Sequence, residues 1–149
     1  MIIDTHFHAF PGKFLELMPE AKTDVRGVGF HAFDHREYLN VMDQYGIDIG
    51  VLSNTGGRIE KGGDRAKALD LCKILNDSFA DAHAKHPHRF KAFARLPMIN
   101  SDDCVRELQR CTKELSSTPT PRSPNGFRVV TTRSRLANPM RSAQPDTQA

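Results

Sequence analysis

The chain has 149 residues, of which 38% are hydrophobic, and its 21 Lys and Arg against 18 Asp and Glu give a formal net charge of +3. This length and composition allow one globular domain with a buried core. The sequence has no apolar run near the roughly 18 residues of a membrane span and does not open like a signal peptide, so we expect a cytoplasmic protein with no membrane partner.

The first predicted element is a strand, because Ile2 and Ile3 open a short β-branched run that reaches His8. Side chains alternate between the two faces of a strand, so His6 and His8 should project to one side and Phe7 to the other. Two neutral imidazoles side by side are half of a metal site, since zinc binds imidazole nitrogen and needs three or four ligands. His6 and His8 are therefore candidate metal ligands.

Residues 9–33 contain several Pro and Gly and predict a long loop with at most one helical turn near an apolar patch. A helix should follow from Asp34, the expected N-cap, with Glu37 completing a capping box and Gly46 closing the helix. Its apolar stripe would consist of Tyr38, Leu39, Met42 and Tyr45.

A second strand is predicted over 47–53, and it runs into the loop residues 54–57. Apolar positions at spacings of three and four then indicate a long helix over 64–85, ended by Pro87, and a third strand over 90–96. His86 and His88 repeat the spacing of the first histidine pair, but they flank that proline and indicate a turn.

A last helix is expected after a cap at Asn100 or Ser101, with one apolar face. The face would carry Val105, Leu108, Cys111 or Thr112, and Leu115. The three cysteines are Cys72, Cys104 and Cys111. They form no CxxC pair, which argues against a disulfide framework, and we expect thiols in or near the core.

Charge and composition change near residue 116. Residues 1–115 hold 16 Lys and Arg against 17 Asp and Glu, whereas residues 116–149 hold five arginines, one acid and five of the nine prolines. We therefore predict a globular part over 1–115 and an irregular Pro/Ser/Thr/Arg-rich tail over 116–149, with 127–131 as a candidate fourth strand. Nucleic acid is not an expected partner, because the arginines are scattered and Phe127 is the one aromatic residue among them.

Strands and helices alternate along residues 1–115. Such alternation is typical of crossover units on a parallel sheet, so the predicted fold class is α/β, either an open doubly wound sheet or a barrel.

Several motifs in the same order resemble a known family. They are 2–8 (IIDTHFH), 42–43 with 45–48 and 51–53, 76–77, 86–90 (HPHRF), 94–97 (ARLP), and 107–108, 110–111 and 113–115. Over residues 1 to about 115 the chain is similar to the amidohydrolase superfamily, in the branch that contains aminocarboxymuconate-semialdehyde decarboxylase and γ-resorcylate decarboxylase. The resemblance implies a (β/α)8 TIM barrel, of which this part would form the first three to four βα units.

The resemblance also implies a metal. His6 and His8 would bind one divalent ion, zinc in the first place and manganese as the alternative, at the carboxyl end of a barrel strand where such sites lie. His86 and His88, at the start of a strand, would lie at the opposite end. The family's other ligands, a histidine and an aspartate from later strands, are expected beyond residue 115, where this chain has no histidine. We hypothesise that the reading frame ends or shifts near residue 116.

By resemblance the function is that of a metal-dependent hydrolase or non-oxidative decarboxylase of a small carboxylated molecule. Arg58, in the loop after the second strand, is a candidate anchor for the substrate carboxylate. His31 and His35 flank a helix cap and favour a surface or capping role. The alternative function is an inactive half-barrel that serves as a binding or assembly module and self-associates through its open sheet.

Overall fold

The structure, a computed structural model, describes residues 1–22, 27, 29–54 and 59–115. The predicted tail over 116–149 and the candidate strand over 127–131 lie outside the described residues. In chain order the elements are β1 (Ile3–His8), α1 (Gly12–Leu17), the 3-10 helix η1 (Pro19–Lys22), α2 (His35–Gln44), β2 (Ile49–Ser53), α3 (Arg65–Lys85), β3 (Phe90–Ala92), α4 (Ser101–Arg110) and the π-helix η2 (Cys111–Leu115).

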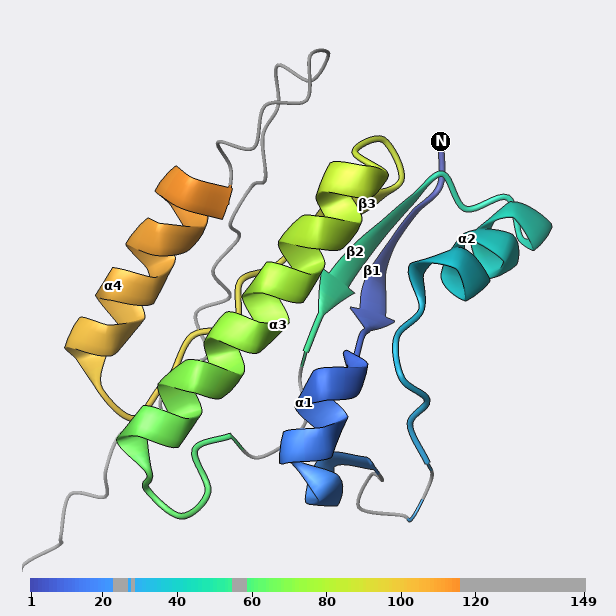
Figure 1. Cartoon of the computed structure of the whole chain (residues 1–149). Helices are drawn as coiled ribbons and strands as arrows, with labels where there is room; N and C mark the ends of the chain where they lie inside the picture. Colours follow the sequence, from blue (N-terminus) through green and yellow to red (C-terminus); the bar gives the residue numbers. More distant parts are fainter. Residues whose placement is uncertain (23–26, 28, 55–58, 116–149) are drawn as a thin grey trace, which may run out of the picture.

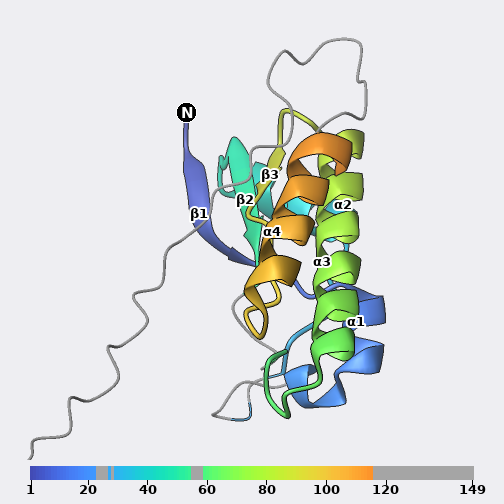
Figure 2. The ribbon, with the colours of Figure 1, turned by 90° about the vertical axis from the view of Figure 1, so that its left-hand side faces the viewer.

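The described strands form one parallel sheet in the order β1-β2-β3, which confirms the predicted α/β class. Helices α1, α3 and α4 lie on the same side of this sheet (Figures 1 and 2). Because parallel strands end at a common edge, the residues that follow β1, β2 and β3 come together at the carboxyl edge of the sheet.

Strand β1 is irregular where it carries the histidines. Its register with β2 pairs Phe7 with Leu52 and His8 with Ser53, but it shifts between Asp4 and Phe7. A carboxylate oxygen of Asp4 accepts a hydrogen bond of 2.9 Å from the backbone N–H of His6, which stabilises this local bend. The sequence pattern did not predict the bend, because alternation alone assumes a regular strand.

Phe7 points away from the two histidines, as predicted, and packs against the helical layer. Its ring centroid lies 4.5 Å from that of Tyr38 and 6.4 Å from that of Phe90. Gly50 of β2 makes room for this ring, since an added Cβ would lie 3.1 Å from Cδ1 of Phe7 and 3.4 Å from Sδ of Met42. A side chain at position 50 would therefore displace the ring.

The region predicted as a long loop contains more structure than expected. Residues 12–17 form α1 and 19–22 form η1. Phe14 is fully buried, with Leu15, Met18 and Ala21 also in the core. The short apolar patch is therefore a helix whose partners lie far away in the sequence, and local propensity alone could not show this.

The predicted cap at Asp34 is confirmed, and the structure adds a cap at the start of the next helix. Asp34 caps α2 and accepts a hydrogen bond of 2.7 Å from the backbone N–H of Arg36 rather than of Glu37, and Gly46 follows the helix at a φ of 66°. Asp64 caps α3 by accepting from the backbone N–H of Lys67 at 2.9 Å. Helix α3 ends at Lys85, before the proline that was expected to stop it.

Strand β3 has three residues instead of the predicted seven over 90–96. In the part that was predicted to continue the strand, the backbone of Arg95 is hydrogen-bonded by the side chain of Asn76, a fully buried residue of α3. Its amide donates to the carbonyl of Arg95 at 2.9 Å and accepts from the N–H of Arg95 at 2.8 Å. A side chain thus satisfies backbone groups that a longer strand would pair.

The predicted apolar face of α4 is confirmed only in part, since Cys111 is buried and Leu108 is half-buried. Val105 is 53% exposed, whereas Asp103 and Glu107 are each 2% exposed. Both carboxylates are paired with arginines: Asp103 with Arg65 and Arg106, and Glu107 with Arg110. Ion pairing therefore brings two carboxylates into the buried face and leaves Val105 outside it, although the cap at Asn100 is as expected.

The cysteines lie in or near the core, as predicted, and form no disulfide bond. Cys72 and Cys111 are buried and Cys104 is half-buried. Burial raises the pKa of the Cys72 and Cys111 thiols to about 12, which keeps them protonated at neutral pH.

His83 of α3 should make the fold sensitive to acid. Its Nδ1 lies 2.7 Å from the carbonyl oxygen of Phe90, and burial lowers its pKa below 6.5 although this hydrogen bond opposes the shift. The unfolded chain therefore binds a proton at a higher pH than the folded chain, and stability is lost as the pH falls below 6.5.

Below pH 6.5, we expect the free energy of unfolding to fall less steeply with pH in His83→Gln than in the wild type, by at most about 1.4 kcal/mol per pH unit. Urea unfolding of both proteins from pH 7.5 to 5 measures the two slopes. Equal slopes would exclude His83 as a source of the acid sensitivity.

Among the described residues, none of the helices has the length and apolar character that crossing a bilayer requires.

Candidate metal centre

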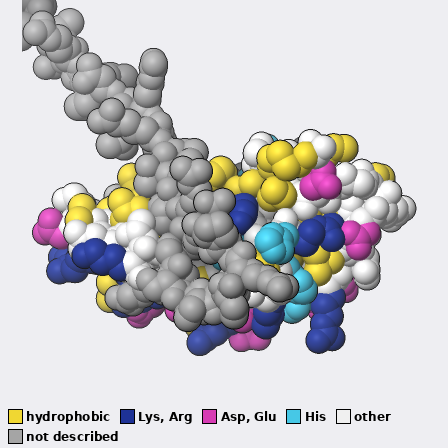
Figure 3. All heavy atoms as spheres, turned by 90° about the horizontal axis from the view of Figure 1, so that it is seen from above, with side chains coloured by type: hydrophobic (Ala, Val, Ile, Leu, Met, Phe, Trp, Pro, Cys, Tyr) yellow, Lys and Arg dark blue, Asp and Glu magenta, His cyan; other side chains and the backbone are white. Residues whose placement is uncertain are grey.

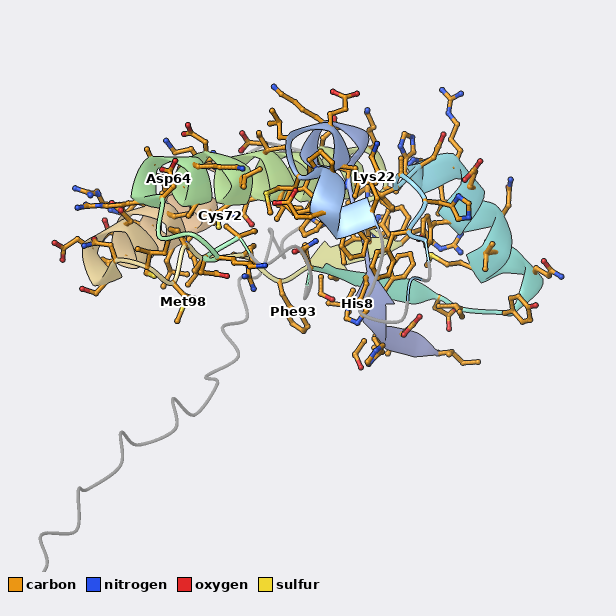
Figure 4. All side chains as sticks on the ribbon, turned by 90° about the horizontal axis from the view of Figure 1, so that it is seen from below. His8, Lys22, Asp64, Cys72, Phe93 and Met98 are labelled. Atoms are coloured by element: carbon orange, nitrogen blue, oxygen red, sulfur yellow. The ribbon has the colours of Figure 1, made fainter. Side chains whose placement is uncertain are left out.

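The two predicted ligands lie together at the carboxyl end of β1. Nε2 of His8 is 3.1 Å from Nε2 of His6, and the ring centroids are 4.6 Å apart with an interplanar angle of 64°. The two imidazoles therefore project to the same side, as predicted. Figure 4 shows that His8 and Phe93 extend from the sheet on the side away from the helices.

The separation of the two nitrogens fits a shared metal ion. With metal–nitrogen bonds of about 2.1 Å, nitrogens 3.1 Å apart subtend about 95° at the ion, between the octahedral and tetrahedral angles. Two imidazoles are an incomplete ligand set for either geometry. Within the described part of the chain, no group of three or more His, Cys, Asp or Glu could hold a metal ion.

The electrostatic surroundings keep His8 neutral. Burial lowers the pKa of its imidazole below 6.5, the neighbouring His6 lowers it further, and Asp4 opposes the shift. Neutral imidazole is the form that binds metals, so this environment favours the ligand state at neutral pH.

Two polar residues at the end of β2, Ser53 and Asn54, lie beside the histidine pair, and the sequence motifs indicated a role for neither. Oγ of Ser53 lies 3.1 Å from Nδ1 of His8. Asn54 donates from Nδ2 to the carbonyl oxygen of Ala9 at 3.3 Å, while its Oδ1 is buried and accepts no hydrogen bond in the described structure. These contacts of Ser53 and Asn54 depend on the register between β1 and β2, which the local sequence does not indicate.

Arg95, which follows β3 at the same edge, was not predicted as a site residue either. Its guanidinium binds both carboxylate oxygens of Glu60 at 2.7 and 2.9 Å. The Nε of Arg95 is buried and makes no hydrogen bond in the described structure. Arg58, the predicted carboxylate anchor, lies outside the described residues.

The remaining histidines that the sequence singled out do not join the pair. His31 is exposed. His35 in the first turn of α2 has its ring centroid 5.1 Å from that of His86, and His88 lines an open pocket with Asp43, Asp48 and Arg89. Figure 3, viewed from the end where the strands begin, shows histidine side chains beside basic ones there. Because His86 and His88 precede β3 in a parallel sheet, they lie away from the carboxyl edge, as predicted.

No protein-family model matches the chain. It is 40% identical over 77 residues to the gamma-resorcylate decarboxylase of Rhizobium sp. (strain MTP-10005), and 30% identical over 90 residues to the 2-amino-3-carboxymuconate-6-semialdehyde decarboxylase of Dictyostelium discoideum. These matches cover 52% and 60% of this chain but 24% and 25% of the relatives. The chain therefore spans about a quarter of the length of the curated relatives it matches.

Solved structures show the same relationship. A dihydroxybenzoic acid decarboxylase from Polaromonas sp. JS666, with bound manganese and the inhibitor 2-nitroresorcinol, matches with a TM-score of 0.55 and 26% identity over 76% of this chain and 35% of that chain. An amidohydrolase II structure matches with a TM-score of 0.68 over 77% of this chain and 38% of that chain, and at 23% identity this likeness shows the fold. The sequence-based resemblance to decarboxylases of the amidohydrolase superfamily is thus confirmed over about half of the chain.

Proposed function

We propose that residues 1–115 supply the first part of a divalent-metal site that removes the carboxyl group of a small carboxylated aromatic compound. The observation that carries this proposal is the pair of imidazole nitrogens 3.1 Å apart at the carboxyl end of β1. Decarboxylation is favoured over hydrolysis because the two relatives described above are decarboxylases.

Each residue of the site has a distinct role in this proposal. His6 and His8 hold the ion, which when bound acts as a Lewis acid that polarises and orients substrate oxygens. Asn54 offers its unsatisfied Oδ1 to a hydroxyl hydrogen of the substrate. Arg58 binds the substrate carboxylate through its guanidinium. A divalent ion is the cofactor, with zinc or manganese as the candidates.

Metal analysis tests the site directly. After loading with Mn²⁺ or Zn²⁺ and dialysis, the wild-type chain should retain stoichiometric metal, whereas His6→Ala and His8→Ala should each lose it, because one imidazole is a weak site. His88→Ala is the matched control, since it removes a histidine from a pair of the same spacing at the other end of the sheet.

Metal that is retained equally by the wild type and by the His6→Ala, His8→Ala double variant would refute the assignment, as would a wild type that retains none.

Release of carbon dioxide from 2,6-dihydroxybenzoate by the loaded protein tests the reaction itself. Loss of release in Arg58→Ala with unchanged metal content would support the anchor.

A second candidate function, an assembly module, is favoured by the edge of the described sheet. β1 pairs with β2 alone among the described strands, and Ile2 and Ile3 are 56% and 45% exposed. Such an edge can pair with a strand of another chain. Size-exclusion chromatography with light scattering would show a defined oligomer that Ile3→Lys disrupts if this function holds.

A further inference from the structure

A chain of hydrogen bonds links the backbone of β1 to the imidazole of His8 through a side chain of β2. Oγ of Ser53 lies 3.1 Å from the carbonyl oxygen of Phe7 and 3.1 Å from Nδ1 of His8. Ser53 is 9% exposed, and it is held opposite His8 by the strand register.

The direction of each hydrogen bond follows from the number of protons available. A carbonyl oxygen carries no hydrogen, so Ser53 must donate its hydroxyl proton to Phe7. That proton is the only one the hydroxyl has. The contact with His8 can then be a hydrogen bond only if Nδ1–H of His8 donates to Oγ of Ser53.

This direction determines the tautomer of His8. A neutral imidazole carries one N–H, so a proton on Nδ1 leaves the lone pair on Nε2. Nε2 of His8 faces Nε2 of His6 at 3.1 Å. In the absence of metal, His6 must therefore donate its own Nε2–H to His8.

We propose that Ser53 is a positioning residue that holds His8 in the Nδ1–H tautomer, so that Nε2 is ready to bind a metal ion. The inference rests on the proposed function of the histidine pair. It also makes the two ligands unequal. His8 keeps its proton on Nδ1 when metal binds, whereas His6 must move its proton from Nε2 to Nδ1 to offer the same nitrogen.

Nitrogen-15 NMR of the histidine-labelled, metal-free protein tests the tautomers. The signals are assigned by their loss in His6→Ala and His8→Ala. We expect His8 as the Nδ1–H form and His6 as the Nε2–H form, and on addition of Zn²⁺ a change of tautomer at His6 alone. Ser53→Ala should convert His8 to a mixture of tautomers, whereas Ser53→Thr keeps the hydroxyl and should preserve the wild-type pattern.

Metal affinity gives a second readout. Removal of an outer hydrogen-bond partner of a ligand weakens binding about 10–100-fold, so Ser53→Ala should bind Zn²⁺ more weakly by this factor and Ser53→Thr should not. An Nε2–H tautomer of His8 in the wild type would overturn the inference even if Ser53→Ala fails to fold. An unchanged His8 tautomer in folded Ser53→Ala would overturn it too. The metal-free spectra require no bound ion, so a chain that retains no metal would refute the proposed function and still give a separate answer on the role of Ser53.

Discussion

Replacement of Glu107 by Ala should lower the free energy of unfolding by about 3–5 kcal/mol, the usual cost of breaking a buried ion pair from one side. Glu107 accepts hydrogen bonds from Arg110 at 2.8 and 2.9 Å and from Asn76 at 2.7 Å. Burial alone would raise the pKa of this carboxyl, but the bonds from Arg110 and Asn76 hold it below its ordinary value. The alanine variant leaves both donors without this acceptor.

Urea unfolding followed by circular dichroism measures the effect. Glu107→Gln should fall between the wild type and Glu107→Ala, because it keeps an acceptor oxygen for Asn76 and loses the charge that pairs with Arg110. Gln109→Ala, an exposed change on the same helix, should stay within about 0.5 kcal/mol of the wild type. If Glu107→Ala unfolds like Gln109→Ala, the network does not hold α4 in place.

Phe14→Ala should cost about 3–5 kcal/mol, because it opens a cavity in the core where α1 meets α3. Phe14 is fully buried, and its ring centroid lies 6.4 Å from that of Phe10. The loss should release α1, which follows the histidine-bearing strand after a few residues.

Leu17→Ala is the matched control for Phe14→Ala, since Leu17 lies on the same short helix and is 48% exposed. Its midpoint of urea unfolding should stay near that of the wild type. Equal changes in the two variants would mean that the buried ring of Phe14 contributes no more to stability than the exposed side chain of Leu17, since alanine favours the helix at both positions.

The sequence predicted the elements whose signals are local. Asp34 acts as the cap that the pattern predicted, because capping is decided within one helical turn. The orientation of α4 could not be predicted in this way. Its buried carboxylates Asp103 and Glu107 depend on arginines and on Asn76, and Arg65 and Asn76 lie more than 30 residues away.

The same difference between local signals and long-range contacts applies to the candidate site. His6 and His8 are two residues apart, so strand geometry was enough to place their imidazoles together. Ser53 lies 45 residues from His8, and its hydrogen bond depends on a strand register that includes the irregularity after Asp4. The spacing of residues in the sequence does not predict this register, so the sequence indicated Ser53 only as part of a strand.

The close approach of Phe7 to Gly50 links the position of His6 and His8 to the packing of the core. Phe7 stands between His6 and His8 in the chain, and its ring occupies the space that a side chain at position 50 would fill. A larger residue at position 50 would displace the ring of Phe7, and Phe7 is joined to each histidine by one peptide bond. We therefore expect the packing around Gly50, which has no chemistry of its own, to affect the distance between the two candidate ligand nitrogens.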